Sequence, residues 1–146
     1  MCSSDLLNGV AGQEQIRLSV ASAFLPTEEN EIITINFGNM EVHVAGNFKY
    51  TAGQLVVHDY LDTDTYGLLR AWRQSVADAQ SGNVKLATSY KKTARIVLTA
   101  PDLSSTREFQ LTGLWPVSIT PTALSYGRAA QLDITMSLVY DLALPA

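Results

Sequence analysis

The sequence has few residues of the kinds that cross-link a chain, bind metals or carry charge. It contains one cysteine, Cys2, and two histidines in 146 residues. A single cysteine excludes an internal disulfide and a thiolate metal cage. The apolar runs, such as Leu55–Val57, are far shorter than the 18 residues that span a bilayer, and residues 1–5 lack the basic and apolar regions of a secretory signal. We therefore expect a chain that folds in a reducing cytosol and does not insert into membranes.

Charge is also scarce, at 16% of residues against the usual quarter, while 47% of residues are hydrophobic. A chain of this length and hydrophobicity buries a full core, so disorder is excluded as its main state. We expect a single domain over residues 1–146, in which residues 1–13 form a flexible or interface-ordered N-terminal arm. The low charge is also a hint that part of the surface is covered by other protein copies.

The few charges are sorted along the chain. Residues 1–69 hold nine acidic and two basic side chains, residues 70–107 hold two acidic and seven basic ones, and residues 108–146 hold three acidic and one basic. The segments therefore carry −7, +5 and −2, which gives the formal net charge of −4. This is compatible with an unremarkable solvated surface, or with two faces of opposite sign that meet head to tail between copies. A nucleic-acid-binding protein would be basic overall, so that class is excluded.

Alternation of apolar and polar residues with period two dominates the sequence and predicts half-buried strands. It runs through residues 16–20, 33–37 and 40–44, and the Gly38-Asn39 pair between the last two predicts a β-hairpin. Further strands are expected over 47–51 and 54–61, on either side of Ala52-Gly53. After residue 91 the same pattern returns over 92–100, 108–119 and 131–141, with Trp115-Pro116 expected to interrupt or bend the middle strand.

One segment has helical periodicity instead. Leu69, Trp72 and Val76 recur at i, i+3 and i+7, which places them on one buried helix face. Residues 62–65 offer N-cap side chains, and Gly82 fits a C-cap, so we expect one helix of about 15 residues. Seven or eight strands with one helix and no βαβ order predict a mainly β fold: an antiparallel barrel or sandwich flanked by a single α-helix.

Residue patterns that carry catalysis are missing. His43 and His58 each lie within a strand and are expected to be structural or solvent-facing, and the sequence has no Gly-x-Ser-x-Gly elbow, zinc spacing or phosphate-binding glycine loop. The carboxylates at Asp59, Asp62 and Asp64 lack the spacing of a calcium loop and fit helix capping better. We expect no catalytic, cofactor-binding or metal-binding residues, no cofactor and no enzymatic activity.

Two stretches resemble the tail tube proteins of bacteriophages and related contractile injection systems. Tyr66–Val76 is similar to the single tryptophan-containing helix of that family, which follows an extended strand. Phe109–Ile119 is similar to a family strand that contains a Trp-Pro pair, here Trp115 and Pro116. A last long strand, Gln131–Asp141, follows as in the family. The order of these pieces matches over residues 30–143, although Val57-His58-Asp59 stands where many contractile-tail tube proteins have a Lys-Arg-Gly-type segment.

The resemblance implies a structural virion protein that forms hexameric rings, stacked into a hollow tail tube through which phage DNA passes. Strands of neighbouring subunits would join around the lumen, and sheath, terminator, baseplate or tape measure proteins would be further partners. The protein would be assembled in the host cytoplasm and reside in the virion tail. An uncharged to acidic lumen suits passing DNA, because Lys and Arg would hold its phosphates. Acidic residues expected at the lumen or between subunits are Glu28, Glu29, Glu31 and Glu41. Basic residues expected at ring-stacking or outer surfaces are Lys85, Lys91, Lys92 and Arg95.

Three alternatives remain open at this point. The first is the tube of a related injection system, namely type VI secretion or a tailocin. The second, from another class, is a small β-barrel module that binds an apolar ligand, although the large Ile, Leu, Val, Phe and Met side chains of the strands tend to fill such a barrel. The third is an enzyme with an unmarked site.

Overall fold

The computed structural model describes residues 2–8, 20–59, 64–102, 104–122 and 132–145, which form nine strands and two helices. The strands are β1 (Cys2–Asn8), β2 (Val20–Ser22), β3 (Glu28–Phe37), β4 (Met40–Tyr50), β5 (Gly53–Asp59), β6 (Lys92–Thr99), β7 (Ser105–Pro121), β8 (Leu132–Val139) and β9 (Leu142–Pro145). The helices are α2 (Thr65–Val76) and α3 (Ala87–Tyr90). The strand expected over residues 16–20 lies mostly outside the described residues.

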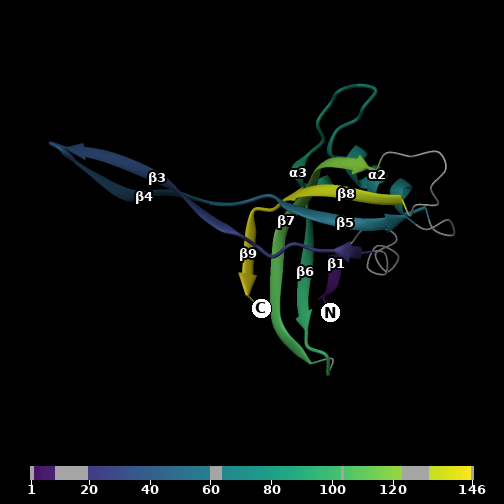
Figure 1. Cartoon of the computed structure of the whole chain (residues 1–146). Helices are drawn as coiled ribbons and strands as arrows, with labels where there is room; N and C mark the ends of the chain where they lie inside the picture. Colours follow the sequence, from purple (N-terminus) through teal and green to yellow (C-terminus); the bar gives the residue numbers. More distant parts are fainter. Residues whose placement is uncertain (1, 9–19, 60–63, 103, 123–131, 146) are drawn as a thin grey trace.

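The body of the molecule is an antiparallel sheet that changes direction along β7. Its order is β1-β6-β7-β8-β5-β2, and β9 also pairs with β7. The first part of β7 pairs with β6 and β9, and its last part, from Trp115, pairs with β8. In Figure 1 the strands β6, β7 and β9 consequently run across the direction of β5 and β8. β7 thus joins two strand layers that cross at a steep angle.

The core fills the space between these layers and α2. Alternate residues of β5 and β8 are fully buried, as period-two alternation requires, and their partners on the other face are more exposed. The buried cluster is Leu55, Val57, Leu69, Trp72, Ala94, Ile96, Leu111, Leu114, Ile134, Met136, Leu138, Tyr140 and Ala143. Both strand layers and the helix therefore share one hydrophobic core.

The bend in β7 has a local cause. Gly113 has φ +74°, a left-handed conformation that costs a residue with a Cβ atom about 1–2 kcal/mol. The Asp141 carboxylate lies against Gly113 on the side where a Cβ would be, and the Asp141 amide donates to the Thr112 carbonyl (3.0 Å). Trp115 and Pro116 lie within β7, just beyond this point, and the register shifts between Pro116 and Ser118. The Trp-Pro pair therefore accompanies a bend and does not end the strand.

Helix α2 begins where the sequence predicts and ends earlier. The Asp64 carboxylate accepts a hydrogen bond from the Gly67 amide (2.9 Å), which caps the N-terminus. The three residues expected on its inner face, Leu69, Trp72 and Val76, are all buried. The helix has 12 residues because the Val76 carbonyl accepts from the Lys85 amide (2.9 Å), at the base of a small excursion of the chain. Gly82, predicted as the C-cap, lies instead in the turn of that excursion, with φ +70°.

Two further expectations are refined. Residues 2–8, expected in a flexible or interface-ordered arm, form β1, which pairs with β6 and supplies partners for backbone groups that β6 would otherwise expose. Residues 9–13 lie outside the described residues. The mainly antiparallel β fold with its helix is confirmed, without barrel closure in the part of the chain that the structure describes. The second helix, α3, is only four residues long, and its Tyr90 carbonyl accepts from the Trp72 indole (3.0 Å).

Candidate assembly surface

The most distinctive feature is a hairpin that leaves the body of the molecule. Among the described strands, β3 and β4 (Glu28–Tyr50) pair only with each other and form their own two-stranded sheet, which we call the arm. Figure 1 shows the arm extending far from the other strands. Ten residues of strand cover roughly 34 Å. The Gly38-Asn39 turn at its tip, with Gly38 at φ +63°, agrees with the hairpin expected from the sequence.

The distal arm has one apolar and one polar face. Directly opposed residues of an antiparallel pair lie on the same face. The pairs Ile33 with Val44, Ile35 with Val42, and Phe37 with Met40 therefore build a continuous apolar face. The alternating pairs, Thr34 with His43 and Asn36 with Glu41, build the opposite face, and the Thr34 hydroxyl lies 3.3 Å from His43 Nδ1. This is the pattern of a strand pair with water on one side and protein on the other.

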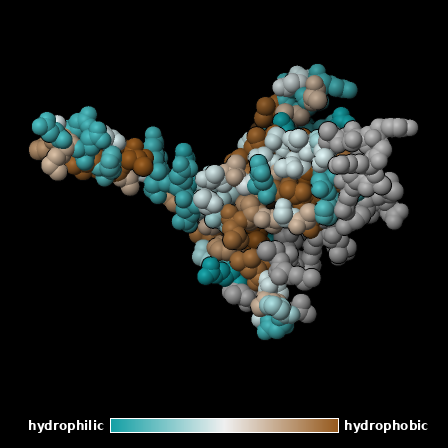
Figure 2. Space-filling model, in the orientation of Figure 1, coloured by the Kyte–Doolittle hydropathy of each residue, from teal (hydrophilic) through white to brown (hydrophobic). Residues whose placement is uncertain are grey.

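No part of the described chain covers the apolar face. Phe37 is 78% exposed and Met40 69%, and Figure 2 shows the arm's hydrophobic groups open to the surroundings among hydrophilic ones. An isolated two-stranded hairpin is at best marginally stable in water. Burying a side chain of this kind stabilises by roughly 1.5–3 kcal/mol. Six such residues represent several kcal/mol, comparable with the stability of a whole domain. The large apolar residues exposed on the arm are Ile32, Ile33, Ile35, Phe37, Met40, Val42, Val44 and Phe48.

The base of the arm is held firmly by aromatic residues. The ring of Tyr50 packs 5.4 Å from that of Tyr140, which also stacks on Phe24 at 5.7 Å. The Tyr50 hydroxyl donates to the Ala143 carbonyl of β9 (3.2 Å), and the Thr27 amide donates to the Tyr140 hydroxyl (3.1 Å). These contacts tie both ends of the arm to the core. Desolvation by burial raises the pKa of Tyr140 above its usual value of 10.0.

A β-bulge separates the base from the distal arm. The register shifts between Asn30 and Ile32, opposite Gly46 and Asn47 of β4. A Cβ on Gly46 would lie 3.0 Å from the Glu31 carbonyl oxygen and 3.1 Å from the side chain of Ile33, so glycine lets the strands approach here. Bulges bend a strand and raise its twist. The bulge thus sets the direction in which the distal arm leaves the body.

The four acidic residues predicted for the lumen or subunit contacts, Glu28, Glu29, Glu31 and Glu41, are all exposed and all lie on the arm. Three are at its base and Glu41 is on its distal polar face. No lysine or arginine occurs between residues 31 and 48. Their lumen position stays a prediction, because a single copy has no lumen.

The four predicted basic residues, Lys85, Lys91, Lys92 and Arg95, are spread over the body. Lys91 Nζ lies 2.6 Å from the Asp141 carboxylate, which raises the lysine pKa, and Arg95 forms an ion pair with Glu108. Lys85 follows α2 in an exposed segment, and Lys92 begins β6. Two of the four are thus paired within the chain, and their role in ring stacking stays a prediction.

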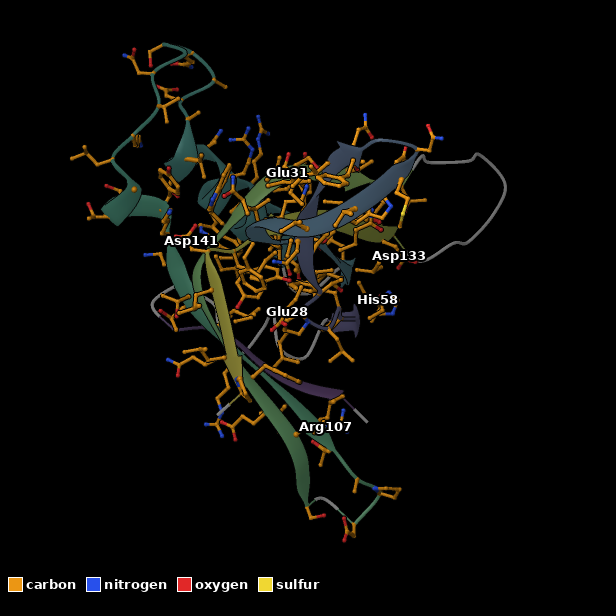
Figure 3. The ribbon with its side chains drawn as sticks, turned by 90° about the vertical axis from the view of Figure 1, so that its left-hand side faces the viewer. Glu28, Glu31, His58, Arg107, Asp133 and Asp141 are labelled. Atoms are coloured by element: carbon orange, nitrogen blue, oxygen red, sulfur yellow. The ribbon has the colours of Figure 1, made fainter. Side chains whose placement is uncertain are left out.

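Another pair of polar side chains lies on the main sheet. His58 Nδ1 lies 2.5 Å from Asp133 Oδ1 across the β5–β8 pair, and in Figure 3 the two side chains lie together, well apart from Asp141. No group of three or more potential metal ligands occurs among the residues described. None of the helices in that part of the chain is long and apolar enough to cross a membrane. A further surface feature, a groove of about 480 Å³, lies between α2 and the last part of β7.

Sequence reasoning found the arm's strands and did not find its exposed apolar face. Alternation predicts a buried side for a strand, whether its own chain or another copy supplies the cover. Ile35 and Val42 have the same pattern as the buried Ile134 and Met136 of β8, so the sequence contains no signal that separates them.

Known proteins resemble this chain in structure and not in sequence. No family model matches the chain and no curated protein matches it in sequence. A chain in the structure of the sheath/tube terminator of the PVC extracellular contractile injection system is 13% identical, with a TM-score of 0.70, covering 99% of this chain and 92% of that one.

The chain shares its fold with chains of contractile injection systems. A chain in the PVC sheath-tube complex matches with a TM-score of 0.63 and 15% identity, over 88% of this chain and 85% of that one. Another, in the tube-terminating cap of the anti-feeding prophage, matches with a TM-score of 0.66 and 15% identity, over 87% and 79%. The structural neighbours are therefore parts of contractile injection systems, as the helix and Trp-Pro motifs predicted, and α2 and β7 contain these motifs.

Proposed function

We propose that this protein is a structural subunit of a phage-like tail, which assembles into hexameric rings stacked as a hollow tube. It acts by its geometry and not as an enzyme. The observation that carries this proposal is the apolar face of the arm. A surface of this extent on a soluble chain marks a protein–protein interface, and the tail-tube fold supports copies of the same chain as its cover.

The two faces of the arm have different tasks in this proposal. The apolar face, from Ile33 to Val44, packs on a neighbouring copy. The polar face, with Thr34, Asn36, Glu41 and His43, lines the channel. A wall without Lys or Arg does not hold phosphates, so DNA passes down the channel without sequence-specific binding.

The partners and location follow from the same proposal. The subunit contacts itself within and between rings, and meets sheath, terminator, baseplate or tape measure proteins at the ends and outside of the tube. It is assembled in the host cytoplasm and resides in the tail of the virion, or in the tube of a related injection system.

Negative-stain microscopy of the purified protein tests the proposal. Wild-type protein should form rings or tubes of uniform width. The variant Ile35→Ser/Val42→Ser, on the apolar face, should stay monomeric with an unchanged circular dichroism spectrum, since neither side chain supports the core. Its matched control, Thr34→Ser/Asn36→Ser on the polar face, should still assemble. A wild-type protein that stays monomeric at millimolar concentration would overturn the proposal.

A second candidate is a ring that ends a tube. It is favoured by the match to a chain in the terminator structure, which covers 99% of this chain, whereas the match in the sheath-tube complex covers 88%. Such a protein should form single closed rings that do not lengthen with concentration, whereas a tube subunit should form filaments whose mean length grows.

A further inference from the structure

The groove between α2 and β7 has the properties of a binding site for an extended chain. Tyr66, Arg70, Arg73 and Gln74 line it from the helix, and Val117–Ile119 line it from β7. In this last part β7 pairs with β8 on one side, and no described strand pairs with its other edge. An open strand edge beside a groove is where an extended peptide adds by backbone hydrogen bonds.

The charge of the groove selects the kind of peptide. Arg73 Nε donates to the Val117 carbonyl (3.1 Å), which fixes the guanidinium at the edge of β7. Arg70 is exposed one turn earlier on the same helix, and neither arginine forms an ion pair within the described residues. A guanidinium has five N–H donors and binds carboxylates in a bidentate manner. The two guanidinium groups of this groove therefore match a ligand that has two carboxylates.

One carboxylate already lines the groove and must be accounted for. Asp78 accepts hydrogen bonds from the Gln80 amide and the Ser81 hydroxyl, both at 3.0 Å. These bonds lower its pKa, so it is ionised and committed to the turn after α2. With two arginines and one aspartate, the groove keeps a net positive charge.

The chain itself contains a segment that fits. Glu28–Glu31 at the base of the arm is extended and exposed, and carries three carboxylates in four residues. Glu29 and Glu31, two residues apart in a strand, are separated by about 7 Å. Arg70 and Arg73, at i and i+3 of a helix, have Cβ atoms about 5–6 Å apart. Among the described residues, these two carboxylates accept one hydrogen bond, a weak one from the Thr51 hydroxyl to Glu29 (3.3 Å).

No ion pair or hydrogen bond joins these two surfaces within one molecule in the part of the chain that the structure describes. Two different patches that match each other produce a head-to-tail interface, which closes into a ring when the rotation allows. We infer that the groove of Arg70 and Arg73 binds the Glu28–Glu31 segment of a second copy. This inference rests on the proposed self-assembly and names the pairing that orients neighbouring subunits.

Charge exchange tests the pairing. Arg70→Glu/Arg73→Glu and Glu29→Arg/Glu31→Arg should each raise the concentration needed for assembly at least about tenfold, measured by light scattering. Combining the four substitutions should bring it back to within about threefold of wild type, since the pairs are restored with reversed signs. The control combines Glu29→Arg/Glu31→Arg with Lys85→Glu/Lys92→Glu, which restores the same net charge elsewhere. If it recovers assembly equally well, the pairing is refuted.

A second measurement separates this inference from the proposed function. A labelled peptide of residues 26–34 is titrated into the monomeric Ile35→Ser/Val42→Ser variant and followed by fluorescence anisotropy. Binding that weakens about tenfold on adding Arg70→Glu/Arg73→Glu supports the groove even if the wild-type protein forms no tubes. The opposite outcome is also informative. If the protein forms tubes, but the peptide does not bind the groove and the four combined substitutions do not restore assembly, the proposed function stands and the inference is overturned. Equal assembly of wild type and Arg70→Glu/Arg73→Glu would assign the groove to another protein and also overturn it.

Discussion

The ring of Tyr50, the last residue of the arm, lies 5.4 Å from the ring of Tyr140, the residue that follows β8. This contact connects the exposed hairpin to the hydrophobic core, because Tyr140 is 4% exposed and belongs to the core cluster. The arm is therefore attached by a rigid base, although none of the described residues covers its distal part.

The Tyr50 contacts can be separated by two substitutions. Tyr50→Phe removes the hydrogen bond to Ala143 and should cost about 1 kcal/mol of unfolding free energy. Tyr50→Ala also removes the ring and should cost roughly 2 kcal/mol or more, and should speed proteolysis within residues 28–50. Urea unfolding and limited proteolysis measure the two effects. Thr34→Ala, on the distal arm, serves as the control and should change neither.

Alkaline pH should destabilise the chain through Tyr140. Its pKa in the folded state is raised above 10.0, mainly by burial, so the folded state holds the phenol proton more tightly than the unfolded state. Stability from this group is complete below pH 10 and is lost as the pH rises through the folded pKa. Tyr140→Phe should therefore flatten the loss of stability above pH 10 in urea titrations. A variant that loses stability as steeply as wild type would show that another group titrates there.

The bend of β7 should depend on Gly113. Gly113→Ala places a Cβ in left-handed backbone and against Asp141 Oδ2, which forces the carboxylate away from Lys91. The expected loss is roughly 2–4 kcal/mol, from the backbone conformation and the displaced side chain together. The double variant Gly113→Ala/Asp141→Ala removes the collision. Its loss of unfolding free energy, measured by thermal unfolding, should therefore be smaller than the sum of the losses of the two single variants. Strict additivity of the two would argue against the collision.

Salt should weaken assembly only in part. The charge segregation and the Arg70–Arg73 groove predict a higher assembly concentration in molar salt, since exposed charges are screened over about 3 Å there. The apolar face of the arm is not screened and should keep some tubes intact. Sedimentation at low and molar salt measures this. A tube length distribution that does not change would indicate that apolar contacts dominate.

Local patterns predicted most elements of the fold, but not β1, β9 or α3. Alternation located the strands β3 to β8, although residues 47–51, expected as a separate strand, form the end of β4. The spacing of Leu69, Trp72 and Val76 located α2. These features depend on neighbours within a few residues, which a sequence displays directly. The Trp115-Pro116 motif also located the bend of β7, although the bend depends on Gly113 and Asp141, which are 28 residues apart.

Features set by distant partners were not predictable in this way. The end of α2 depends on the bond from Lys85 to the Val76 carbonyl, and the pairing of residues 2–8 depends on β6. The apolar face of the arm is open because its proposed cover belongs to another copy, and the sequence of one copy does not show which chain covers a strand. Arg70 and Arg73 line the groove together with an edge of β7 that is more than 40 residues away in sequence. From the sequence, these arginines were recognised only as part of a basic segment.

The pairing of β1 with β6 has a consequence for the order of folding. Cys2 pairs with Leu98, so the main sheet stays incomplete until most of the chain has left the ribosome, and such distant contacts form slowly. The arm is a local hairpin with a short turn, and hairpins form within microseconds. Its apolar face is therefore presented before the body that orients it exists. Newly made chains are thus exposed to premature association through the arm, and slow synthesis or low expression temperature should favour the yield of correctly folded subunits.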